Sequence, residues 1–503
     1  MERGPGHEST GDVTGDGQAS VDTEPRPARL AVPGDPSPGV NVVGFLEAES
    51  GLGEIARRIA AALERSGVPV AAISHGRTRR RQLHPRALSL RDEAPYDTNL
   101  VCLNPGHLPS FVAEAGSGFF ARRYAIGVWF WETSRLRAAE RDAARFFDEL
   151  WVASRYIRNV VEPELDIPVH VMPTPMEPPP GPFRTRAELS LPDAFTFLFV
   201  FDLWSEERKN PRAVVDAFTR AFAPGEGPTL VLKSIHGDSK THELERLRAL
   251  GGDRGDIVVR DGYVSPHERD SYLAGCDCYV SLHRSEGLGL TMAEAMALGK
   301  PVIATGYSGN LEFMSESNSY LVPYELSDVP SSWWAYAPGA TWAEPDVEAA
   351  AALMRRVWEQ RDEARALGER ARHELLERFP PGRTADFVER RREELRAHGA
   401  IAARASGHDA RPAIVDASQA LAGDAGASLV ERGGARPTSF ARRLLRRALW
   451  PSLEGQRRVD TALLEAVSSL QRSVDGLERR LRHLEGSETE NGDDAATGRP
   501  ARP

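Results

Sequence analysis

Cysteine and long apolar runs are scarce in this chain of 503 residues. It has three cysteines, Cys102, Cys276 and Cys278, and the single pair Cys276-x-Cys278 without a second pair is a weak metal signal. No apolar run reaches the roughly 20 residues that a membrane-spanning helix needs. The first residues, MERGPGHEST, lack the basic and then apolar pattern of a signal peptide. We therefore expect a cytoplasmic protein whose cysteines are interior residues.

Lysine is also scarce, because only Lys209, Lys233, Lys240 and Lys300 occur among the 63 basic residues. Arginine fills nearly every position that only needs a positive charge, so a retained lysine marks a place where a compact ammonium is wanted. Lys240, within HGDSKTHE, is nevertheless typical of plain surface. The net charge of −10 argues against a general nucleic-acid-binding role.

Two series of alternating strand and helix patterns indicate two parallel α/β domains. The first occupies residues 40–176, and residues 1–39 before it lack periodicity and are typical of disorder. The second occupies residues 193–375, after a proline-rich linker at 177–192. We expect two Rossmann-like, doubly wound parallel-sheet domains that face one cleft, because ligands of such sheets bind at the carboxyl ends of the strands. A charged closing helix is expected at 376–399.

The rest of the chain divides into a flexible linker at 400–438, a helical segment at 439–486 and a disordered end at 487–503. Residues 440–450, FARRLLRRALW, form a basic amphipathic stretch that suits either an anionic lipid surface or the acidic body of the protein. Beyond it, apolar residues repeat every seven positions over about three heptads. This pattern predicts a coiled coil and a homo-oligomer through residues 460–486; the alternative is a solitary surface helix.

The stretch RSEGLGLTMAEAMALGKPVIATGYSGN places Glu286 and Glu294 eight residues apart around a glycine-rich turn from strand to helix. Gly287 and Gly289 leave backbone amides uncovered at a helix start, which is a place for a phosphate or diphosphate. Carboxylates repel phosphate, but they accept hydrogen bonds from the vicinal hydroxyls of ribose and hexose. The pattern therefore favours a sugar nucleotide; the alternative is an exposed helix start with an acidic residue in its first turn.

Neighbouring loops add small and basic residues at the same edge of the sheet. Gly306, Ser308 and Gly309 follow the next strand and leave its backbone exposed. Arg208 and Lys209 follow the first strand of the second domain and can neutralise a diphosphate. A solvated basic loop is the alternative, and the scarcity of lysine favours a functional Lys209.

Residues 198–330 resemble the donor domain of the large retaining, nucleotide-sugar-dependent glycosyltransferase family of group 1, which has the GT-B fold. The E-x7-E pair Glu286/Glu294 within EGLGLTMAEAMALGKPVIAT and the segment RKNP at 208–211 carry this resemblance. The N-terminal half is similar more loosely, through GFLEAESGLGEIARRIAAAL and GVWFWET.

The resemblance implies a role for each matching residue. Glu294 would hold the ribose hydroxyls of the nucleotide, and Glu286 would hold hydroxyls of the transferred hexose. Lys209 would stabilise the charge on the leaving diphosphate. No metal or other cofactor is expected, so basic side chains and the helix dipole would supply the electrostatics. The diphosphate and sugar would face the amides of Gly287, Leu288, Gly289 and Leu290, and the base would be bracketed by the turn of Gly262, Tyr263 and Val264.

Two departures from the family pattern leave positions open. Relatives have an arginine several residues before the lysine, where this chain has FDLWSEE, so either Arg208 or Lys233 would be the second positive charge. Relatives also have a histidine at the end of a strand of the N-terminal domain. This chain has Trp131-Glu132 there, so Glu132 or His107 would take over a contact with the sugar or the acceptor.

The segment GLGEIA, which begins at Gly51, matches the dinucleotide-binding pattern after a strand and before a helix. A dehydrogenase would want an acidic residue about 20 positions on, where this chain has Ser74-His75-Gly76, which argues against NAD. In a GT-B protein, Gly51 and Gly53 would let this loop approach the donor phosphate or the acceptor. Close packing of helix on strand is the alternative for at least one of them.

These observations together predict a retaining hexosyltransferase that moves a hexose from a GDP- or UDP-sugar to a glycan or lipid-linked acceptor. Glu286, Lys209 and Glu132 would be its catalytic residues, and peripheral contact with the inner face of the cell membrane is open. The alternative is an inactive GT-B body that binds nucleotide sugars and assembles partners through its coiled coil. Slow hydrolysis of a nucleotide sugar favours the enzyme, whereas tight binding without turnover favours the scaffold.

Overall fold

The computed structural model describes residues 30–78, 80–84, 88–331, 333 and 336–406. The predicted basic stretch and coiled coil lie outside these residues, as do most of the predicted linker at 400–438 and the first 29 residues. Within the described part of the chain, no helix is long and apolar enough to cross a membrane.

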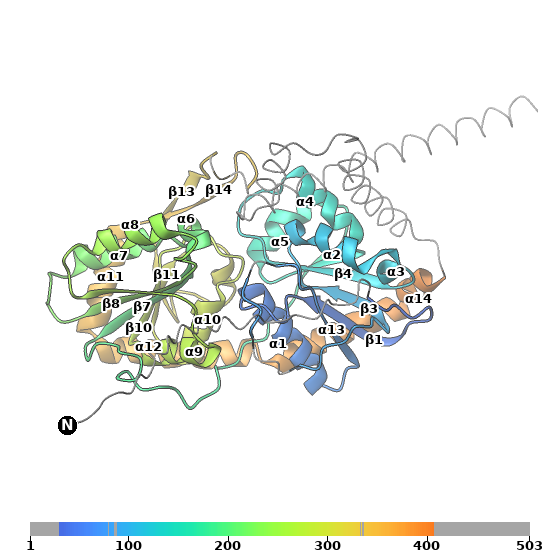
Figure 1. Ribbon diagram of the computed structural model, residues 1–503, viewed down its shortest axis with the longest axis horizontal. Coiled ribbons are helices and arrows are strands. Elements are labelled where there is room, and N and C mark those ends of the chain that lie inside the picture. Colours follow the sequence, from blue (N-terminus) through green and yellow to red (C-terminus); the bar gives the residue numbers. More distant parts are fainter. Residues whose placement is uncertain (1–29, 79, 85–87, 332, 334–335, 407–503) are drawn as a thin grey trace, which may run out of the picture.

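The first domain is built on a six-stranded sheet with the order β2-β1-β3-β4-β5-β6, and every strand pair in it is parallel. Most of its strands are largely apolar, because helices cover both faces of the sheet (Figure 1). The strands are β1 (Ser37–Gly44), β2 (Val70–Ser74), β3 (Tyr96–Val101), β4 (Tyr124–Trp129), β5 (Glu149–Val152) and β6 (Val169–Val171). The helices are α1 (Gly51–Arg65), α2 (Leu108–Ala115), α3 (Ser117–Phe120), α4 (Ala138–Ala143) and α5 (Arg155–Val161).

The second domain repeats this architecture with the strand order β12-β11-β10-β7-β8-β9, again all parallel. In Figure 1, α7 and α8 lie on one side of this sheet and α9 and α12 on the other. The strands are β7 (Thr196–Asp202), β8 (Thr229–Ile235), β9 (Ile257–Asp261), β10 (Cys278–Ser281), β11 (Val302–Thr305) and β12 (Tyr320–Val322). The helices are α6 (Glu206–Lys209), α7 (Pro211–Ala221), α8 (Thr241–Gly251), α9 (Pro266–Gly275), α10 (Leu290–Ala297), α11 (Val347–Glu359) and α12 (Arg361–Arg378). The prediction of two parallel α/β domains is confirmed.

Three segment boundaries differ from those expected. Residues 31–39 are ordered rather than disordered, because Ala31 bridges Glu93 and β1 already begins at Ser37. The expected boundary between residues 375 and 376 falls inside α12, which ends at Arg378 before a proline. The alanine-rich start of the expected flexible linker forms α14 (Ala400–Ala405) instead, because its Ile401 is buried against the first domain.

The helix α13 (Pro381–Ala397) follows the second domain in sequence but packs against the first, beside α1 (Figure 1). Arg391 donates to the fully buried carboxylate of Glu149 at 2.8 Å. Its neighbour Arg392, also buried, reaches Asp97 at 3.3 Å. Such charge-assisted pairs are the strong kind of hydrogen bond. The chain therefore ties both domains together at α13, in addition to the linker.

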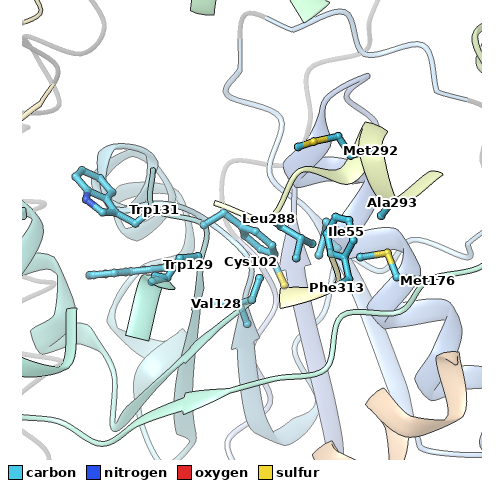
Figure 2. Close-up of a cluster of buried hydrophobic side chains, with 14 of the residues drawn as sticks. Ile55, Cys102, Val128, Trp129, Trp131, Met176, Leu288, Met292, Ala293 and Phe313 are labelled. Atoms are coloured by element: carbon cyan, nitrogen blue, oxygen red, sulfur yellow. The ribbon is translucent and has the colours of Figure 1, made fainter. Parts of the chain in front are cut away.

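The apolar core is continuous from one domain to the other. Figure 2 shows Ile55 and Val128 of the first domain in one cluster with Leu288 and Phe313 of the second. Met176, at the end of the first domain, lies in the same cluster. Because these residues lie near the carboxyl ends of strands or in the segments that follow them, the two sheets meet at the edge where α/β domains bind ligands.

The two glycines of the GLGEIA loop have different surroundings. A Cβ atom on Gly53 would lie 2.5 Å from the carbonyl oxygen of Phe45 and 2.7 Å from that of Ala48, whereas one on Gly51 would meet nothing within 4 Å. Gly53 also donates its amide to the Ser50 hydroxyl that caps α1. The close-packing alternative therefore describes Gly53, and only Gly51 has space beside it.

We predict that Gly53→Ala lowers the free energy of unfolding by about 1–3 kcal/mol, because the backbone must shift to relieve the clash. Gly51→Ala is the matched control, since it adds the same methyl group at an open position of the same helix start. Urea unfolding of both variants measures the effect, and equal stabilities would contradict the packing argument.

Candidate functional site

The loop between β10 and α10 lies where the two domains meet. Gly289, with φ +88°, turns the chain into α10, and glycine is the residue that adopts this conformation without strain. A Cβ on Gly287 would lie 3.3 Å from the carbonyl oxygen of Trp131 in the first domain. A Cβ on Gly309 would lie 2.0 Å from the oxygen of Gly287. The glycines thus allow this loop to approach both the opposite domain and the loop after β11.

The backbone donors of this loop are open. The amides of Gly287, Leu288, Gly289 and Leu290 form no hydrogen bond with any residue that the structure describes. The preceding amide, that of Glu286, is bound by the Ser308 hydroxyl at 2.8 Å. Four successive unpaired amides at the start of α10 make a ready site for an anion.

Glu286 lies in a buried cluster of charges that belongs to both domains. Its Oε1 accepts from Lys209 Nζ and lies 3.3 Å from Arg208 Nη1. Arg208 Nη2 in turn lies 3.3 Å from Glu132, which follows β4 of the first domain. Burial works against ionisation of Glu286, but Lys209 and Arg208 outweigh it and lower its pKa to about 2. Burial also opposes the charge of Arg208, yet Glu132 and Glu286 raise its pKa above the usual value.

The local sequence explains why Lys209 and Arg208 reach this position. The single turn α6 ends at Lys209, and the next residue, Asn210, adopts the left-handed conformation at φ +54°. Asn210 then caps α7, and Pro211 occupies the first helical position, where a missing amide hydrogen costs nothing. Arg208 is fixed because its Nη1 donates to the Ser285 carbonyl at 2.7 Å.

Glu294 lies in α10, one helical turn after the helix begins at Leu290, and is held by arginines from both domains. Its Oε1 accepts from Arg58 Nη2 of α1 at 2.5 Å and from Arg269 Nη2 of α9 at 3.2 Å. The Glu294 side chain is 0% exposed, and its Oε2 has no hydrogen-bond partner among the described residues. Arg58 of α1 therefore occupies one oxygen of a fully buried carboxylate whose other oxygen is unpaired among the described residues.

The turn expected to bracket the base lies against a loop of the first domain. Arg81 Nη2 donates to the Val264 carbonyl at 3.3 Å, and its guanidinium lies 4.5 Å from the centre of the Tyr263 ring. Gly262 makes the turn at φ +112°. The Gly262 carbonyl, however, accepts the ammonium of Lys233, so this lysine supports the turn. Burial lowers the pKa of Lys233 to about 8.

Of the two candidates for the second positive charge, the structure therefore brings Arg208, and not Lys233, into direct contact with Glu286. Of the two candidates for the missing histidine, it brings in Glu132 through Arg208. His107 contacts the Phe45 ring edge-on at 4.9 Å, at the end of the short turn Pro105–His107.

Sequence reasoning missed Arg58 and Arg269, the two partners of Glu294. Arg58 is separated from Glu294 by 236 residues, and it lies on the helix that follows the glycine loop. In a chain where arginine is the ordinary basic residue, nothing in the local pattern distinguishes these two arginines from surface ones. Their contact with the buried Glu294 is the signal, and only the fold provides it.

Residues 194–331 match the family model described as Glycosyl transferases group 1. Among curated proteins, the alpha-monoglucosyldiacylglycerol synthase of Streptococcus pneumoniae is 32% identical over 128 residues, which are 25% of this chain and 28% of that protein. The D-inositol 3-phosphate glycosyltransferase of Acidothermus cellulolyticus is 29% identical over 191 residues, 36% of this chain and 42% of that protein. The matched region thus spans less than half the length of either relative.

Two solved structures share the arrangement of both domains. HepE of Anabaena, in complex with UDP and glucose, superposes with a TM-score of 0.51 at 14% identity, covering 71% of this chain and all of that one. The sucrose-phosphate synthase of Thermosynechococcus elongatus gives a TM-score of 0.52 at 16% identity, covering 72% of this chain and all of that one. The chain therefore has the GT-B fold, and residues 194–331 of its second domain match the group 1 glycosyltransferase family model.

We predict that Arg58→Met lowers the free energy of unfolding by about 3 kcal/mol, because it removes one partner of a buried ion pair. Arg65→Met is the matched control on the same helix, since Arg65 forms an exposed pair with Glu177 at 3.3 Å. That pair is worth less than about 1 kcal/mol. Urea unfolding compares the two, and equal losses would show that the Arg58–Glu294 pair does not hold the domains together.

The lowered pKa of Glu286 predicts a pH dependence of stability. A carboxylate whose pKa is about 2 in the folded state and about 4.5 in the unfolded state stabilises the fold fully above pH 4.5. The contribution is lost as the pH falls from 4.5 toward 2. We expect the stability advantage of the wild type over Glu286→Gln to be constant from pH 7 to 5 and to shrink below that. An advantage that grows on acidification would contradict the charge cluster.

Proposed function

We propose that this protein is a retaining glycosyltransferase that transfers a hexose from a GDP- or UDP-sugar to a glycan or lipid-linked acceptor. The observation that carries the proposal is the row of open amides from Gly287 to Leu290, which lies between the two buried carboxylates Glu286 and Glu294. Amides suit a diphosphate, and carboxylates suit the sugar hydroxyls on either side of it. The group 1 match over residues 194–331 supports the same assignment.

In this proposal, each residue has one role. Glu294 accepts from the ribose hydroxyls, and Glu286 accepts from hydroxyls of the hexose. Lys209 and Arg208 stabilise the charge that develops on the leaving diphosphate, which removes the need for a metal. The acceptor hydroxyl attacks the anomeric carbon from the face that the diphosphate leaves, and the departing phosphate takes its proton. Glu132 orients the sugar or acceptor from the first domain.

Donor binding then requires Glu294 and Glu286 to exchange a basic partner for sugar hydroxyls. Arg58 now occupies the Glu294 oxygen that ribose would use, and Lys209 is bound to Glu286. Since the Glu294 side chain is fully buried and bound by Arg58 of α1, we propose that the domains part before the nucleotide enters. We propose that closure over the donor then brings Glu132 back to the reaction centre, as in other enzymes whose domains close on their substrate.

We predict that at least one nucleotide sugar in a panel of UDP- and GDP-hexoses stabilises the protein against heat. A ligand at a hundred times its dissociation constant contributes about 2.7 kcal/mol. Glu294→Ala should lose this stabilisation with the fold intact, because the acceptor of the ribose hydroxyls is gone. A shift that is unchanged in Glu294→Ala would remove the ribose assignment.

We also predict that the wild type slowly hydrolyses the stabilising nucleotide sugar and that Lys209→Ala reduces this rate by about a hundredfold or more, since it removes transition-state stabilisation. Lys240→Ala is the matched control, because Lys240 is a surface lysine paired with Glu243 at 2.8 Å. Tight nucleotide binding without turnover in the wild type would instead favour the inactive scaffold.

A further inference from the structure

A cavity of about 490 Å³ lies at the amino ends of β7, β10 and β11, on the opposite edge of the second sheet from the Glu286 loop. Its volume falls within the range of small-molecule binding sites. Its walls include residues 193–195 before β7, residues 276–277 before β10, residues 298–301 before β11 and the first turns of α12 (Figure 1). Because the proposed donor site lies at the carboxyl ends of these strands, the cavity is separate from it.

The helix α12 packs against two of these walls. Gly368 lies directly on the turn after α10, since a Cβ atom there would be 2.3 Å from the carbonyl oxygen of Gly299. At the start of the same helix, the Arg361 guanidinium lies 5.1 Å from the centre of the Phe195 ring. The cavity is therefore bounded by elements that are held in place by their own packing.

Lys300 is placed on the cavity wall by the way in which α10 ends. The amide of Lys300 donates to the Ala295 carbonyl at 3.0 Å, and the amide of Gly299 donates to the Met296 carbonyl at 2.9 Å. With Gly299 at φ +71°, these bonds form a Schellman motif. The residue after the glycine is frequently apolar in this motif, because it packs on the last helical turn. Here it is a half-buried lysine that lines a cavity.

The ammonium of Lys300 has no partner within the part of the chain that the structure describes. The other three lysines, Lys209, Lys233 and Lys240, are each bound to a carboxylate or to backbone carbonyls. In a chain where arginine is the ordinary basic residue, Lys300 is thus a retained lysine whose charge the fold does not use.

The cavity has an excess of positive charge. It is lined by four basic residues, Arg186, Lys300, Arg361 and Arg365, and by three acidic residues, Asp193, Asp277 and Glu369. Two of the acidic residues have arginine partners, because Asp277 accepts from Arg186 at 3.0 Å and Glu369 lies 3.5 Å from Arg372. Arg365 is paired with Asp362 at 2.8 Å. These pairs balance most of the charges, but not those of Lys300 and Arg361.

Arg361 forms no ion pair with any described residue. Its Nε donates to the Trp358 carbonyl at 3.1 Å, and its guanidinium lies on the Phe195 ring, so its position is fixed while its charge is unbalanced. Asp193 is the lining carboxylate without an ion pair among the described residues, and it is exposed. Two unbalanced cations therefore face one carboxylate.

This set of groups suits a phosphate ester that also carries hydroxyls. A phosphate monoester has a charge of about −1.5 to −2 near pH 7, which two cations can balance. Lysine binds phosphate as a point charge, whereas a carboxylate is best matched by the free fork of an arginine. The fork of Arg361 is already partly used, since its Nε is bound to Trp358. Asp193 can accept hydrogen bonds from hydroxyls but would repel a second anionic group.

We propose that this cavity is a second ligand site and that it takes a small phosphorylated molecule with hydroxyl groups, of the size of a hexose phosphate. Lys300 and Arg361 hold the phosphate, and Asp193 accepts from a hydroxyl. The site lies at the opposite end of α10 from the open amides of Gly287 to Leu290, so its ligand does not compete with the donor. It does not rest on the proposed function, and it involves no chemical step.

The test is isothermal titration calorimetry of the full chain with glucose 6-phosphate, glucose 1-phosphate and mannose 6-phosphate, with glucose as the uncharged counterpart. We expect at least one hexose phosphate to bind and glucose not to bind at the same concentration. Lys300→Gln should weaken this binding about tenfold or more, the scale of one hydrogen bond to a charged group, and Arg361→Gln should act in the same direction. Lys240→Gln is the matched control, since it removes a lysine of the same domain outside the cavity.

Folding of Lys300→Gln is checked by urea unfolding, and we expect wild-type stability because only the backbone of Lys300 takes part in the end of α10. Equal affinity in the wild type and in Lys300→Gln would overturn the proposal, as would the absence of binding by every hexose phosphate. The titrations are repeated with excess UDP, which should leave the affinity unchanged. Binding that UDP abolishes and that Lys300→Gln retains would instead place the phosphate on the open amides of the donor loop, and the cavity assignment would fall while the proposed function remained.

Discussion

Buried carboxylates that need a positive partner govern the place where the two domains meet. Glu286 and Glu294 are almost completely buried, and an isolated charge in that position would be prohibitively costly. Each is therefore neutralised by basic residues, and one partner of Glu294, Arg58, comes from the opposite domain. Arg208 forms the reverse connection, from the second domain to Glu132. The ion pairs that neutralise these carboxylates are thus also contacts between the two domains.

This dual use has a consequence for ligand exchange. A buried ion pair roughly breaks even against its desolvation, so exchanging Arg58 for neutral ribose hydroxyls need not cost much, provided that the guanidinium regains water. Arg58 would regain water if α1 moved away from the second domain. In such a movement α13 would stay with the first domain, because its Arg391 is bound to Glu149.

The fold and part of the site could be predicted from sequence because they depend on local patterns. Buried parallel strands are apolar runs, and the turn around Glu286 is defined by its own glycines. The partners of Glu294 could not be predicted, since burial of Arg58 arises only when the domains dock. The scarcity of lysine did not distinguish the two lysines of this region from each other. Lys209 contacts Glu286, whereas the ammonium of Lys233 donates to backbone carbonyls of a turn. The start of β1 at Ser37 could not be predicted either, because the proline and glycine that follow it are typical of a turn.

The two sides of the site differ in chemistry, and the difference bears on the missing histidine. The donor side carries arginines, a lysine and open amides, as a diphosphate demands. The first domain contributes the carboxylate of Glu132 instead. Glu132 would add a further negative charge there, but Arg208 neutralises it. A carboxylate held in this way can accept a hydrogen bond from an acceptor hydroxyl without repelling the donor, which a free carboxylate in the same position would do. In the proposed function, Arg208 would thus allow Glu132 to take the position where the resemblance expects a histidine.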